Sequence, residues 1–485
     1  IEPDTFRIAA TAMIDYIINY NKEIGNRQTF PDVQPGFMRN LLRAEAPKVG
    51  ESWEDVYSDI ERVVMQGMTH WVAPGFFAYF PAALSFPALL ADLLCGGAPC
   101  IGFSWAASPS CTEMETVMMD WLAKALDLPP CFIHGRHGPG GGVIQGTATE
   151  SMLVTMIAAR NKVISRELSR DPKLSKYDIL PRMVVYTSDC SHSSVEKVGL
   201  LSMIEVRKLS AGRKGVLRRK TLQDAIDKDK KNNKIPTFVC ATLGTTPCCT
   251  YDNVDEIGRI CKFIEDIWLH IDAAYAGAAL ICPEFRHIAD GIKRATSFNL
   301  NLHKWLMVNF DCSGLWVRDS SYLTDSANVN ALFLEHQTQQ TTIDYRHWQI
   351  PLGRRYGSLK IWFVLCMVGI DGLQTHVRRF YHVRRGVAEA KYFENLVRKD
   401  ERFEIVFPVT LGLVCLKLKR PGLNIEENAI NEELNRKIQA DRRIHLVPSI
   451  VHGIYFLRVA TGSVNCSRQA LDNCWDVIRE MSQLV

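Results

Sequence analysis

The sequence predicts an α/β protein with a mostly parallel central sheet, and three observations support this. Short runs rich in β-branched and aromatic residues alternate with helical stretches between about residues 86 and 365. With 47% hydrophobic residues the chain can bury a large core, and 23% charged residues is ordinary for a globular protein. At 485 residues the chain is too long for one ordinary domain. We therefore expect a large α/β unit flanked by smaller units.

The first unit, residues 1–85, is expected to consist of helices joined by proline-rich turns. Apolar residues recur at helical spacing from Phe6 to Tyr20 and again from Trp53 to Met65. This segment has too little apolar surface to form a core by itself. We therefore expect it to lie across another surface, such as that of a second subunit.

The large unit, residues 86–365, repeats a strand and then a helix. Its clearest strands are Arg182–Thr187, Thr237–Thr242 and Ile267–Ile271, and helical stretches such as Val254–Glu265 separate them. Sheets built in this way bind ligands at the carboxyl ends of their strands. The last unit, residues 366–485, reads as a smaller α/β cap with strands near Gly412–Leu418 and Tyr455–Ala460.

Charge and cysteine usage exclude several classes of function. The net charge is only +4, and aspartates interrupt the densest basic stretch, so nucleic-acid binding is not expected. No uninterrupted apolar stretch reaches membrane-spanning length, and no secretory signal heads the chain. The fifteen cysteines include no C-x-x-C pair, and many, such as Cys240 and Cys366, sit in apolar runs. Buried free thiols in the cytosol, without a metal site, are the simplest interpretation.

Two residues near strand ends carry the first chemical signal. Asp272 follows the strand that ends at Ile271, and Lys304 precedes another apolar run. Alone, each residue would usually be an ordinary surface or capping residue. Together they suit pyridoxal 5′-phosphate, which needs a lysine to attach it and an acid to keep its ring nitrogen protonated. Burial beside a cationic ring would also lower the pKa of Lys304.

A phosphate site and a stacking residue are the next candidates. The run Gly140–Gly142 leads toward Ala148 and Thr149, and small residues at the head of a helix suit a phosphate. Glycine clusters more often simply turn the chain, so this signal is weak alone. His192 would ordinarily be a structural histidine, but its place after a strand makes it a candidate to stack on a flat cofactor.

Four motifs together resemble the group II decarboxylases that depend on pyridoxal phosphate, and among them the animal aromatic L-amino acid decarboxylases. The motifs are Asn-Leu-His-Lys-Trp, His-Ile-Asp-Ala-Ala-Tyr-Ala-Gly, Gly-Phe-Ser-Trp-Ala-Ala-Ser-Pro and Asp-Tyr-Arg-His-Trp-Gln-Ile-Pro-Leu-Gly-Arg-Arg. The resemblance runs over essentially the whole chain. It implies the aspartate-aminotransferase-like fold (fold type I) and an obligate homodimer with its active site at the subunit interface.

The resemblance also implies roles for individual residues. Lys304 attaches the cofactor, Asp272 partners its ring nitrogen, His192 stacks above the ring and Ala274 packs beneath it. The phosphate would be held by Ala148, Thr149, Asn301 and His303, with Thr246 close to the ring. The substrate pocket would be lined by Trp71, Tyr79, Phe80 and Pro81, with Ile101 and Phe103 from the partner subunit. Gly353 matches the aromatic decarboxylases, where related histidine decarboxylases carry serine, and favours a bulky aromatic substrate.

Two positions depart from the family pattern. Ala82 stands where catechol-preferring relatives carry threonine, which removes a possible hydrogen bond to the substrate ring. Phe333 occupies the place of the mobile-loop tyrosine, the usual acid that protonates the substrate carbon after CO₂ leaves. Phenylalanine has no proton to give. The resemblance therefore favours reaction with O₂ to an aromatic aldehyde, with ammonia and H₂O₂ as further products.

Two alternatives stay open. Water or His192 could supply the proton and leave an enzyme that forms the amine. A non-catalytic relative that only binds the cofactor is the third possibility, but it would be expected to lack Lys304, Asp272 or His192, and all three are present.

Overall fold

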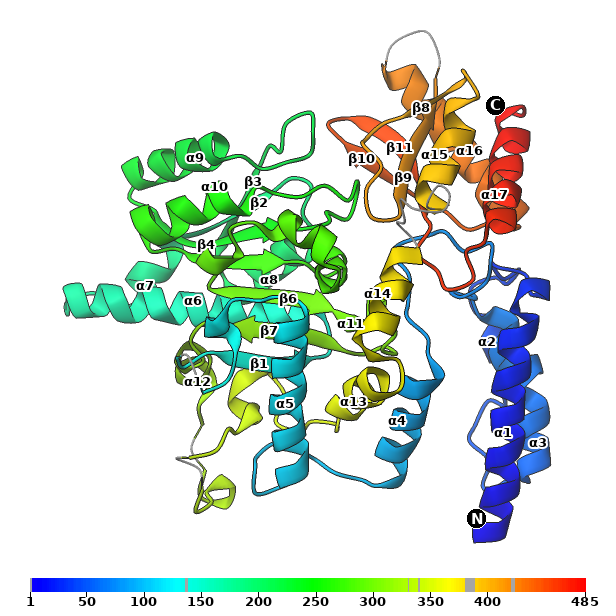
Figure 1. Cartoon of the computed structure of the whole chain (residues 1–485), viewed down its shortest axis with the longest axis horizontal. Coiled ribbons are helices and arrows are strands. Elements are labelled where there is room, and N and C mark those ends of the chain that lie inside the picture. The colour runs from blue at the N-terminus through cyan, green and yellow to red at the C-terminus, as the bar shows by residue number, and fades with distance from the viewer. Residues whose placement is uncertain (1, 136–137, 330, 339–340, 380–388, 420–423) are drawn as a thin grey trace.

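The computed structural model describes residues 2–485 except 136–137, 330, 339–340, 380–388 and 420–423 (Figure 1). The helices are α1 (Pro3–Glu23), α2 (Phe37–Leu41), α3 (Trp53–Asp59), α4 (Phe86–Gly97), α5 (Pro109–Ala125), α6 (Ala148–Arg170), α7 (Lys176–Ile179), α8 (Ser194–Ser202), α9 (Arg219–Lys231), α10 (Val254–Arg259), α11 (Leu302–Trp305), α12 (Ser321–Ala327), α13 (Ser358–Met367), α14 (Gly369–Arg379), α15 (Glu389–Arg398), α16 (Asn424–Asp441) and α17 (Arg468–Ser482). The strands are β1 (Gly141–Gln145), β2 (Met183–Ser188), β3 (Glu205–Leu209), β4 (Ile235–Thr242), β5 (Trp268–Asp272), β6 (Ser297–Asn301), β7 (Ser313–Val317), β8 (Phe403–Ile405), β9 (Leu413–Leu418), β10 (Val447–Val451) and β11 (Ile454–Ala460).

A seven-stranded sheet forms the centre of the molecule, in the order β1-β7-β6-β5-β4-β2-β3. Strands β3, β2, β4, β5 and β6 pair in parallel, whereas β7 is antiparallel to both of its neighbours. Strand β1 therefore points the same way as β6. The predicted α/β class with a mostly parallel sheet is confirmed.

Both faces of this sheet are buried, which explains why its strands are continuous apolar runs. Successive side chains of a strand point to opposite faces. In β5, Trp268 packs with one core cluster, whereas Leu269 and Ile271 pack with the other. In β4, Phe238 packs in the cluster of Trp268, and Val239 packs in the cluster of Leu269 and Ile271. Helix α6 covers the face of Trp268 and contacts β4, β5, β6 and β7.

The C-terminal part contains a second sheet, antiparallel, in the order β10-β11-β9-β8. Helix α17 packs on it through a stripe of apolar residues at helical spacing that includes Leu471, Trp475 and Ile478. A segment from the N-terminal part also joins this sheet, because the Phe77 N–H donates to the His445 carbonyl at 3.0 Å and Ala460 N–H donates to the Phe77 carbonyl at 3.0 Å.

The N-terminal helices form an arm that projects from the body, with α1 and α3 side by side (Figure 1). The Tyr16 hydroxyl donates to Glu61 at 2.6 Å and the Tyr16 and Tyr57 rings lie 6.1 Å apart, so the two helical segments are tied together. Only Ala9 of α1 is buried. Most of the surface of α1 is therefore exposed in the single chain.

The observed elements follow the predicted ones closely, with two corrections. Gly141 and Gly142 belong to strand β1, so the glycine run does not head the helix, which begins at Ala148. Cys366 was expected to be buried, but it is exposed on α13, on a part of the helix where Trp362 and Met367 are exposed as well. Within the described residues, no single helix is long and apolar enough to cross a membrane. Helices α13 and α14 together have sufficient length and apolar composition, but they are bent by 89° relative to each other.

Candidate active site

The carboxyl ends of several strands meet at one edge of the large sheet. Thr242 at the end of β4 pairs with Asp272 at the end of β5, and Asp272 pairs with Asn299 of β6. Lys304 follows in the short helix α11, directly after β6. Strand β1 ends at the same edge and leads into the N-terminus of α6. Ligands bind at this edge in open α/β sheets.

A cavity of about 150 Å³ lies at this edge. All nine residues predicted to bind the cofactor line it: Ala148, Thr149, His192, Thr246, Asp272, Ala274, Asn301, His303 and Lys304. The other lining residues are Phe80, Thr147, Ser194, Thr242, Gly244 and Tyr275. Residues from six separate stretches of the chain therefore converge on one cavity.

The surroundings of Lys304 favour the neutral form of its amine. Burial lowers the pKa of its amine, an effect that the nearby Asp272 carboxylate opposes and the Arg458 guanidinium reinforces. A lowered pKa raises the fraction of neutral amine, which is the reactive form. The Lys304 Nζ lies 5.6 Å from the centroid of the Phe80 ring.

Asp272 is held in place by the turn that follows β5. Its Oδ1 accepts a hydrogen bond from the Ala274 N–H at 3.0 Å, and the Leu243 N–H donates to its carbonyl at 2.8 Å. The carboxylate is 4% exposed and has no salt bridge to any residue that the structure describes. A buried carboxylate that forms no close salt bridge can stabilise a cation that enters the cavity.

The local hydrogen bonds indicate which ring nitrogen of His192 carries the proton. The Ser194 N–H donates to His192 Nδ1 at 3.1 Å, so Nδ1 is an acceptor and the ring proton lies on Nε2. Burial lowers the pKa of His192, which favours the neutral ring. A neutral, flat imidazole can stack on an aromatic cofactor without opposing a positive charge on it.

Polar groups suited to a phosphate line the same cavity. The first N–H groups of α6 have no partner within the helix, and Thr147 caps it by accepting from the Glu150 N–H at 3.3 Å. His303 Nδ1 accepts from the Cys312 N–H at 2.9 Å, which leaves the proton on Nε2 as a donor. Asn301, 5% exposed, adds a side-chain amide whose NH₂ group can donate to a phosphate, and its Oδ1 accepts no hydrogen bond from the described residues. The N–H groups of α6, His303 and Asn301, with Lys304 and Asp272, fit pyridoxal 5′-phosphate.

A buried histidine beneath the site gives a first testable prediction. The His270 ring bonds Ser297 Oγ and Asn299 Oδ1, each at 2.8 Å, and burial lowers its pKa to about 4. The unfolded chain, with a histidine pKa near 6.5, binds the proton first, so stability is lost as pH falls from about 6.5 toward 4. We expect His270 to cost the fold about 2 kcal/mol at pH 5 relative to pH 7.5.

Urea unfolding at pH 7.5 and pH 5 measures this effect. The difference between the two pH values should be smaller by that amount in His270→Gln, whose amide keeps hydrogen-bonding groups but does not titrate. Equal pH dependence in the two proteins would show that His270 is not the group involved.

The predicted substrate residues fall into two groups, and the first lies beside the cavity. The rings of Trp71 and Tyr79 stack with centroids 5.2 Å apart, and Phe80 lines the cavity itself. Tyr79 has a φ of 56°, a left-handed conformation that costs about 1 kcal/mol for a residue other than glycine. This turn lets Tyr79 face Trp71 while Phe80 points inward. Pro81 and Ala82 continue the segment, which is tied to helix α11 because the Ala83 N–H donates to the His303 carbonyl at 2.8 Å.

The second group lies outside this cavity. Ile101 is 62% exposed, and a Cβ added at Gly353 would lie 3.5 Å from Ile101 Cγ2. The Arg346 N–H donates to the Phe103 carbonyl at 3.1 Å. Ile101, Phe103 and Gly353 therefore form one unit on the surface, which we call the Ile101–Gly353 unit, and none of the three lines the cavity of their own chain.

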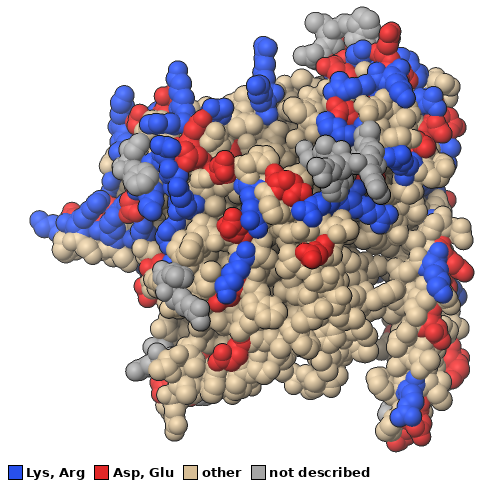
Figure 2. Space-filling model, viewed as in Figure 1, with Lys and Arg blue, Asp and Glu red and all other residues tan. Residues whose placement is uncertain are grey.

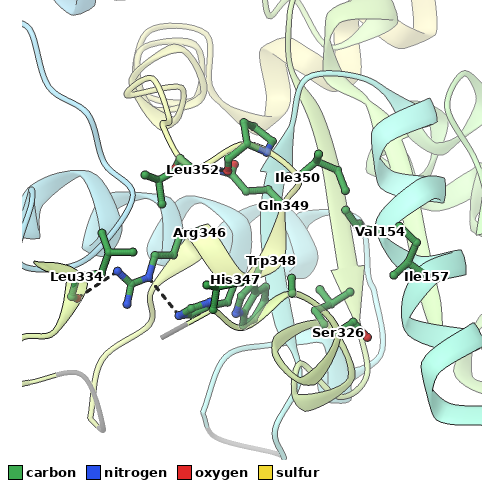
Figure 3. A pocket seen from close by; sticks show the side chains of 14 residues that line it. Val154, Ile157, Ser326, Leu334, Arg346, His347, Trp348, Gln349, Ile350 and Leu352 are labelled. Carbon is green, nitrogen blue, oxygen red and sulfur yellow. Dashed lines mark hydrogen bonds between the residues drawn. The ribbon is translucent and has the colours of Figure 1, made fainter. Parts of the chain in front are cut away.

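A larger cavity of about 350 Å³ lies next to this unit but carries none of the predicted cofactor residues (Figure 3). Apolar side chains such as Val154, Ile157 and Ile350 line it, and Arg346 closes one side by donating from Nη1 to the Leu334 carbonyl at 3.1 Å. Phe333 precedes Leu334 in a 3₁₀ turn, but its side chain lies outside the part that the structure describes. The role of Phe333 stays a prediction.

The sequence interpretation missed a buried arginine and an aromatic stack under the lysine. Arg458 of β11 is 3% exposed and its Cζ lies 5.4 Å from the Phe80 ring centroid. Tyr275 stacks between Phe80, at 3.8 Å, and Trp305, at 5.1 Å. A charged residue inside the apolar strand Tyr455–Ala460 was the available signal for Arg458. No local pattern marks the aromatic stack, because its members are far apart in the sequence.

Comparisons with known proteins agree with this geometry. Residues 35–419 match the model of the pyridoxal-dependent decarboxylase conserved domain. The chain is 49% identical over 482 residues to aromatic-L-amino-acid decarboxylase of Cavia porcellus, covering 99% of this chain and 98% of that protein. Among solved structures, Oryza sativa TDC with PLP and tryptamine superposes with a TM-score of 0.94 at 35% identity, covering 100% of this chain and 99% of that one. Rhodiola rosea 4-hydroxyphenylacetaldehyde synthase gives 0.90 at 35% identity with the same coverage.

Proposed function

This chain belongs to the pyridoxal-dependent decarboxylases, and from that premise we propose that it removes the carboxylate of aromatic L-amino acids. The observation that carries the proposal is the single cavity in which Lys304, Asp272 and His192 meet the N-terminus of α6. The identity of 49% to a relative named for aromatic L-amino acids supports the substrate class. The aromatic walls of Trp71, Tyr79 and Phe80 beside the cavity support it as well.

Each residue of the cavity has a physical task in this reaction. When bound, pyridoxal phosphate supplies a ring that accepts electrons from the bond to the departing carboxylate. Lys304 would offer a neutral amine to attach it, and the Asp272 carboxylate would keep a proton on its ring nitrogen. His192 would stack on the ring, and the α6 N-terminus, Asn301 and His303 would bind the phosphate. These assignments rest on position and chemistry.

The homodimer is part of the proposal, because the chain exposes apolar surface that a second copy would cover. Helix α4 exposes Phe86, Leu90, Leu93 and Leu94, each between 45% and 54%. The surface over α4, α5 and α13 carries few charged side chains in Figure 2. Exposed apolar patches of this kind are typical of protein interfaces. In such a dimer the outward-facing Ile101–Gly353 unit of one subunit would complete the substrate pocket of the other.

The product is the finer question, and two outcomes compete. The identity to the decarboxylase of Cavia porcellus favours the amine. The absence of a phenolic proton donor at Phe333 favours the aldehyde, with O₂ and water consumed and CO₂, ammonia and H₂O₂ released. The fold does not discriminate, because the decarboxylase-like and the synthase structures superpose almost equally well. For the amine route, the Nε2 proton of His192 offers a donor within the cavity.

A product assay on DOPA, tyrosine, phenylalanine and tryptophan separates the two. Amine and H₂O₂ are measured together with CO₂ release, under air and under nitrogen. Stoichiometric amine without peroxide under air assigns the chain to amine formation, whereas peroxide equal to the CO₂ assigns it to the aldehyde. Absence of CO₂ from all four substrates would contradict the proposed function itself.

The variant Phe333→Tyr tests the residue behind the aldehyde outcome. A positioned acid contributes typically ~10²–10⁴-fold to a proton transfer, so restoring the hydroxyl should shift product strongly toward amine. Phe333→Leu is the matched control, because it changes the ring without adding a proton donor. If the tyrosine variant and the leucine variant gave the same ratio of amine to peroxide, Phe333 would not decide the product.

A further inference from the structure

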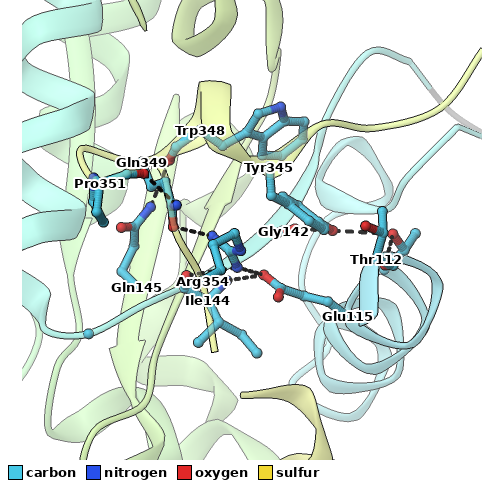
Figure 4. A network of polar contacts seen from close by, with 12 residues as sticks. Thr112, Glu115, Gly142, Ile144, Gln145, Tyr345, Trp348, Gln349, Pro351 and Arg354 are labelled. Carbon is cyan, nitrogen blue, oxygen red and sulfur yellow. Dashed lines mark hydrogen bonds and ion pairs between the residues drawn. The ribbon is translucent and has the colours of Figure 1, made fainter. Parts of the chain in front are cut away.

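A buried ionic network joins helix α5 and strand β1 to the segment that leads into Gly353 (Figure 4). Arg354 and Glu115 form an ion pair whose side chains are only 5% and 1% exposed. We propose that Arg354 is a positioning residue that sets how tightly the neighbouring subunit binds its aromatic substrate. The inference rests on the proposed function and its homodimer, and it assigns a task to a residue that contacts neither substrate nor cofactor.

The guanidinium of Arg354 joins three elements of the fold. One nitrogen donates to Gln349 Oε1, and the other donates to Glu115 and, at 3.3 Å, to the Ile144 carbonyl. The Ile144 N–H donates in turn to Glu115 Oε1 at 2.7 Å. Helix α5, strand β1 and the segment 349–354 are thus clamped together, as Figure 4 shows.

Gln349 passes this constraint to the turn that carries Gly353. Its side-chain amide donates to the carbonyls of Pro351, at 2.6 Å, and Leu352, at 3.2 Å. Because the oxygen of the same amide accepts from Arg354, the arginine determines which way the amide faces. A planar guanidinium presents its donors in a rigid fork, so it orients two acceptors at a defined angle, which a lysine ammonium does not do.

The backbone of Arg354 constrains the other half of the unit. The Gly102 N–H donates to the Arg354 carbonyl at 3.1 Å, which fixes Ile101 beside Gly353. Ile101 and Leu352 are 62% and 48% exposed, and neither lines the cofactor cavity of its own chain. In the proposed homodimer, Arg354 therefore acts on substrate fit in the site of the other subunit.

Stability alone does not explain this ion pair. Desolvation makes a buried ion pair costly, and apolar residues of similar volume are often equally stable in its place. The ion pair fixes the position of the neighbouring backbone through directional hydrogen bonds. A small displacement there matters, because misplacing a bound substrate by about 1 Å can lower the rate by ~10²-fold. The geometry therefore points to positioning rather than to core stability.

Two variants test the proposal. Arg354→Lys keeps the charge beside Glu115 but loses the fork, and the pair Glu115→Leu with Arg354→Met removes both charges while keeping apolar volume. For both we expect the Kd of an aromatic amino acid, read from the change in cofactor absorbance, to rise about 10-fold, with the affinity for pyridoxal phosphate unchanged. A wild-type Kd in both variants would overturn the proposal.

Hybrid dimers show in which site Arg354 acts. Subunits with Lys304→Ala are combined with subunits carrying Arg354→Lys, and the mixed dimer is purified with two different tags. Its one lysine-bearing site takes the Ile101–Gly353 unit from the subunit whose Arg354 is intact, so its Kd should return to the wild-type value. A Kd that stays raised would mean that Arg354 acts within its own subunit, and the proposal would be wrong.

The control is an ion pair outside the site, between a partly exposed arginine and a buried carboxylate. Arg207 pairs with Asp229, whose side chain is 3% exposed, and Arg207→Met should lower the melting temperature while leaving the Kd unchanged. Because binding is read from absorbance, the comparison does not need CO₂ release. If the wild-type protein bound the amino acid but released no CO₂, the proposed function would be contradicted. The Kd values would still show whether Arg354 affects binding.

Discussion

Replacing Lys304 by alanine is expected to lower CO₂ release from aromatic amino acids by at least about 10⁴-fold, the order of loss seen when an enzyme loses its covalent nucleophile. Lys304 is the lysine that lines the cavity, and burial lowers the pKa of its amine toward the reactive neutral form. The variant should also lose the visible absorbance of a lysine-bound pyridoxal cofactor. Activity and absorbance spectra of the purified protein measure both effects.

Lys360 provides the matched control. It is 4% exposed, but its Nζ donates to the carbonyls of Asn309, at 3.2 Å, and Asp311, at 2.9 Å, outside the cofactor cavity. Lys360→Met should keep the cofactor absorbance even if it melts at a lower temperature. A Lys304→Ala protein that was colourless and yet fully active would overturn the whole account.

The second large effect is expected at Asp272. Asp272→Asn keeps the shape of the side chain and can still accept from the Ala274 N–H, but it loses the negative charge. Without that charge the ring nitrogen of the cofactor is no longer held protonated, and kcat should fall about 10²–10³-fold, as when one preorganised electrostatic partner is removed. The cofactor should also dissociate faster on dialysis. Asp229→Asn, a buried carboxylate away from the cavity, should show neither change.

A kcat of Asp272→Asn within about threefold of the wild type would count against its role, because loss of a working electrostatic partner costs far more. If Asp272→Asn had a low kcat but bound the cofactor as tightly as the wild type, Asp272 would act in catalysis and not in cofactor binding.

Much of the fold was predictable because its signals are local. The strand near Ile267–Ile271 is recognisable from its run of apolar residues, and both faces of β5 are indeed covered. The resemblance to the family implied the roles of all nine cofactor residues. Five of them, Asp272, Ala274, Asn301, His303 and Lys304, lie in two of the motifs that carry this resemblance. The nine that were named converge on one cavity.

Other features depend on tertiary packing and left no local pattern. The exposure of Cys366 follows from which side of α13 faces outward, and the stack of Phe80, Tyr275 and Trp305 joins three distant segments. The pairing of Ile101 with Gly353 belongs to the same class. The division into units 1–85, 86–365 and 366–485, the homodimer, the role of O₂ and the role of Phe333 remain predictions.

The most direct measurement locates the cofactor's attachment. The holoenzyme is reduced with borohydride, which makes the link between lysine and cofactor permanent, and the digested peptides are mapped by mass spectrometry. The account predicts a pyridoxyl phosphate group on the peptide that contains Lys304. The group on Lys360 or another lysine, or on none, would contradict it.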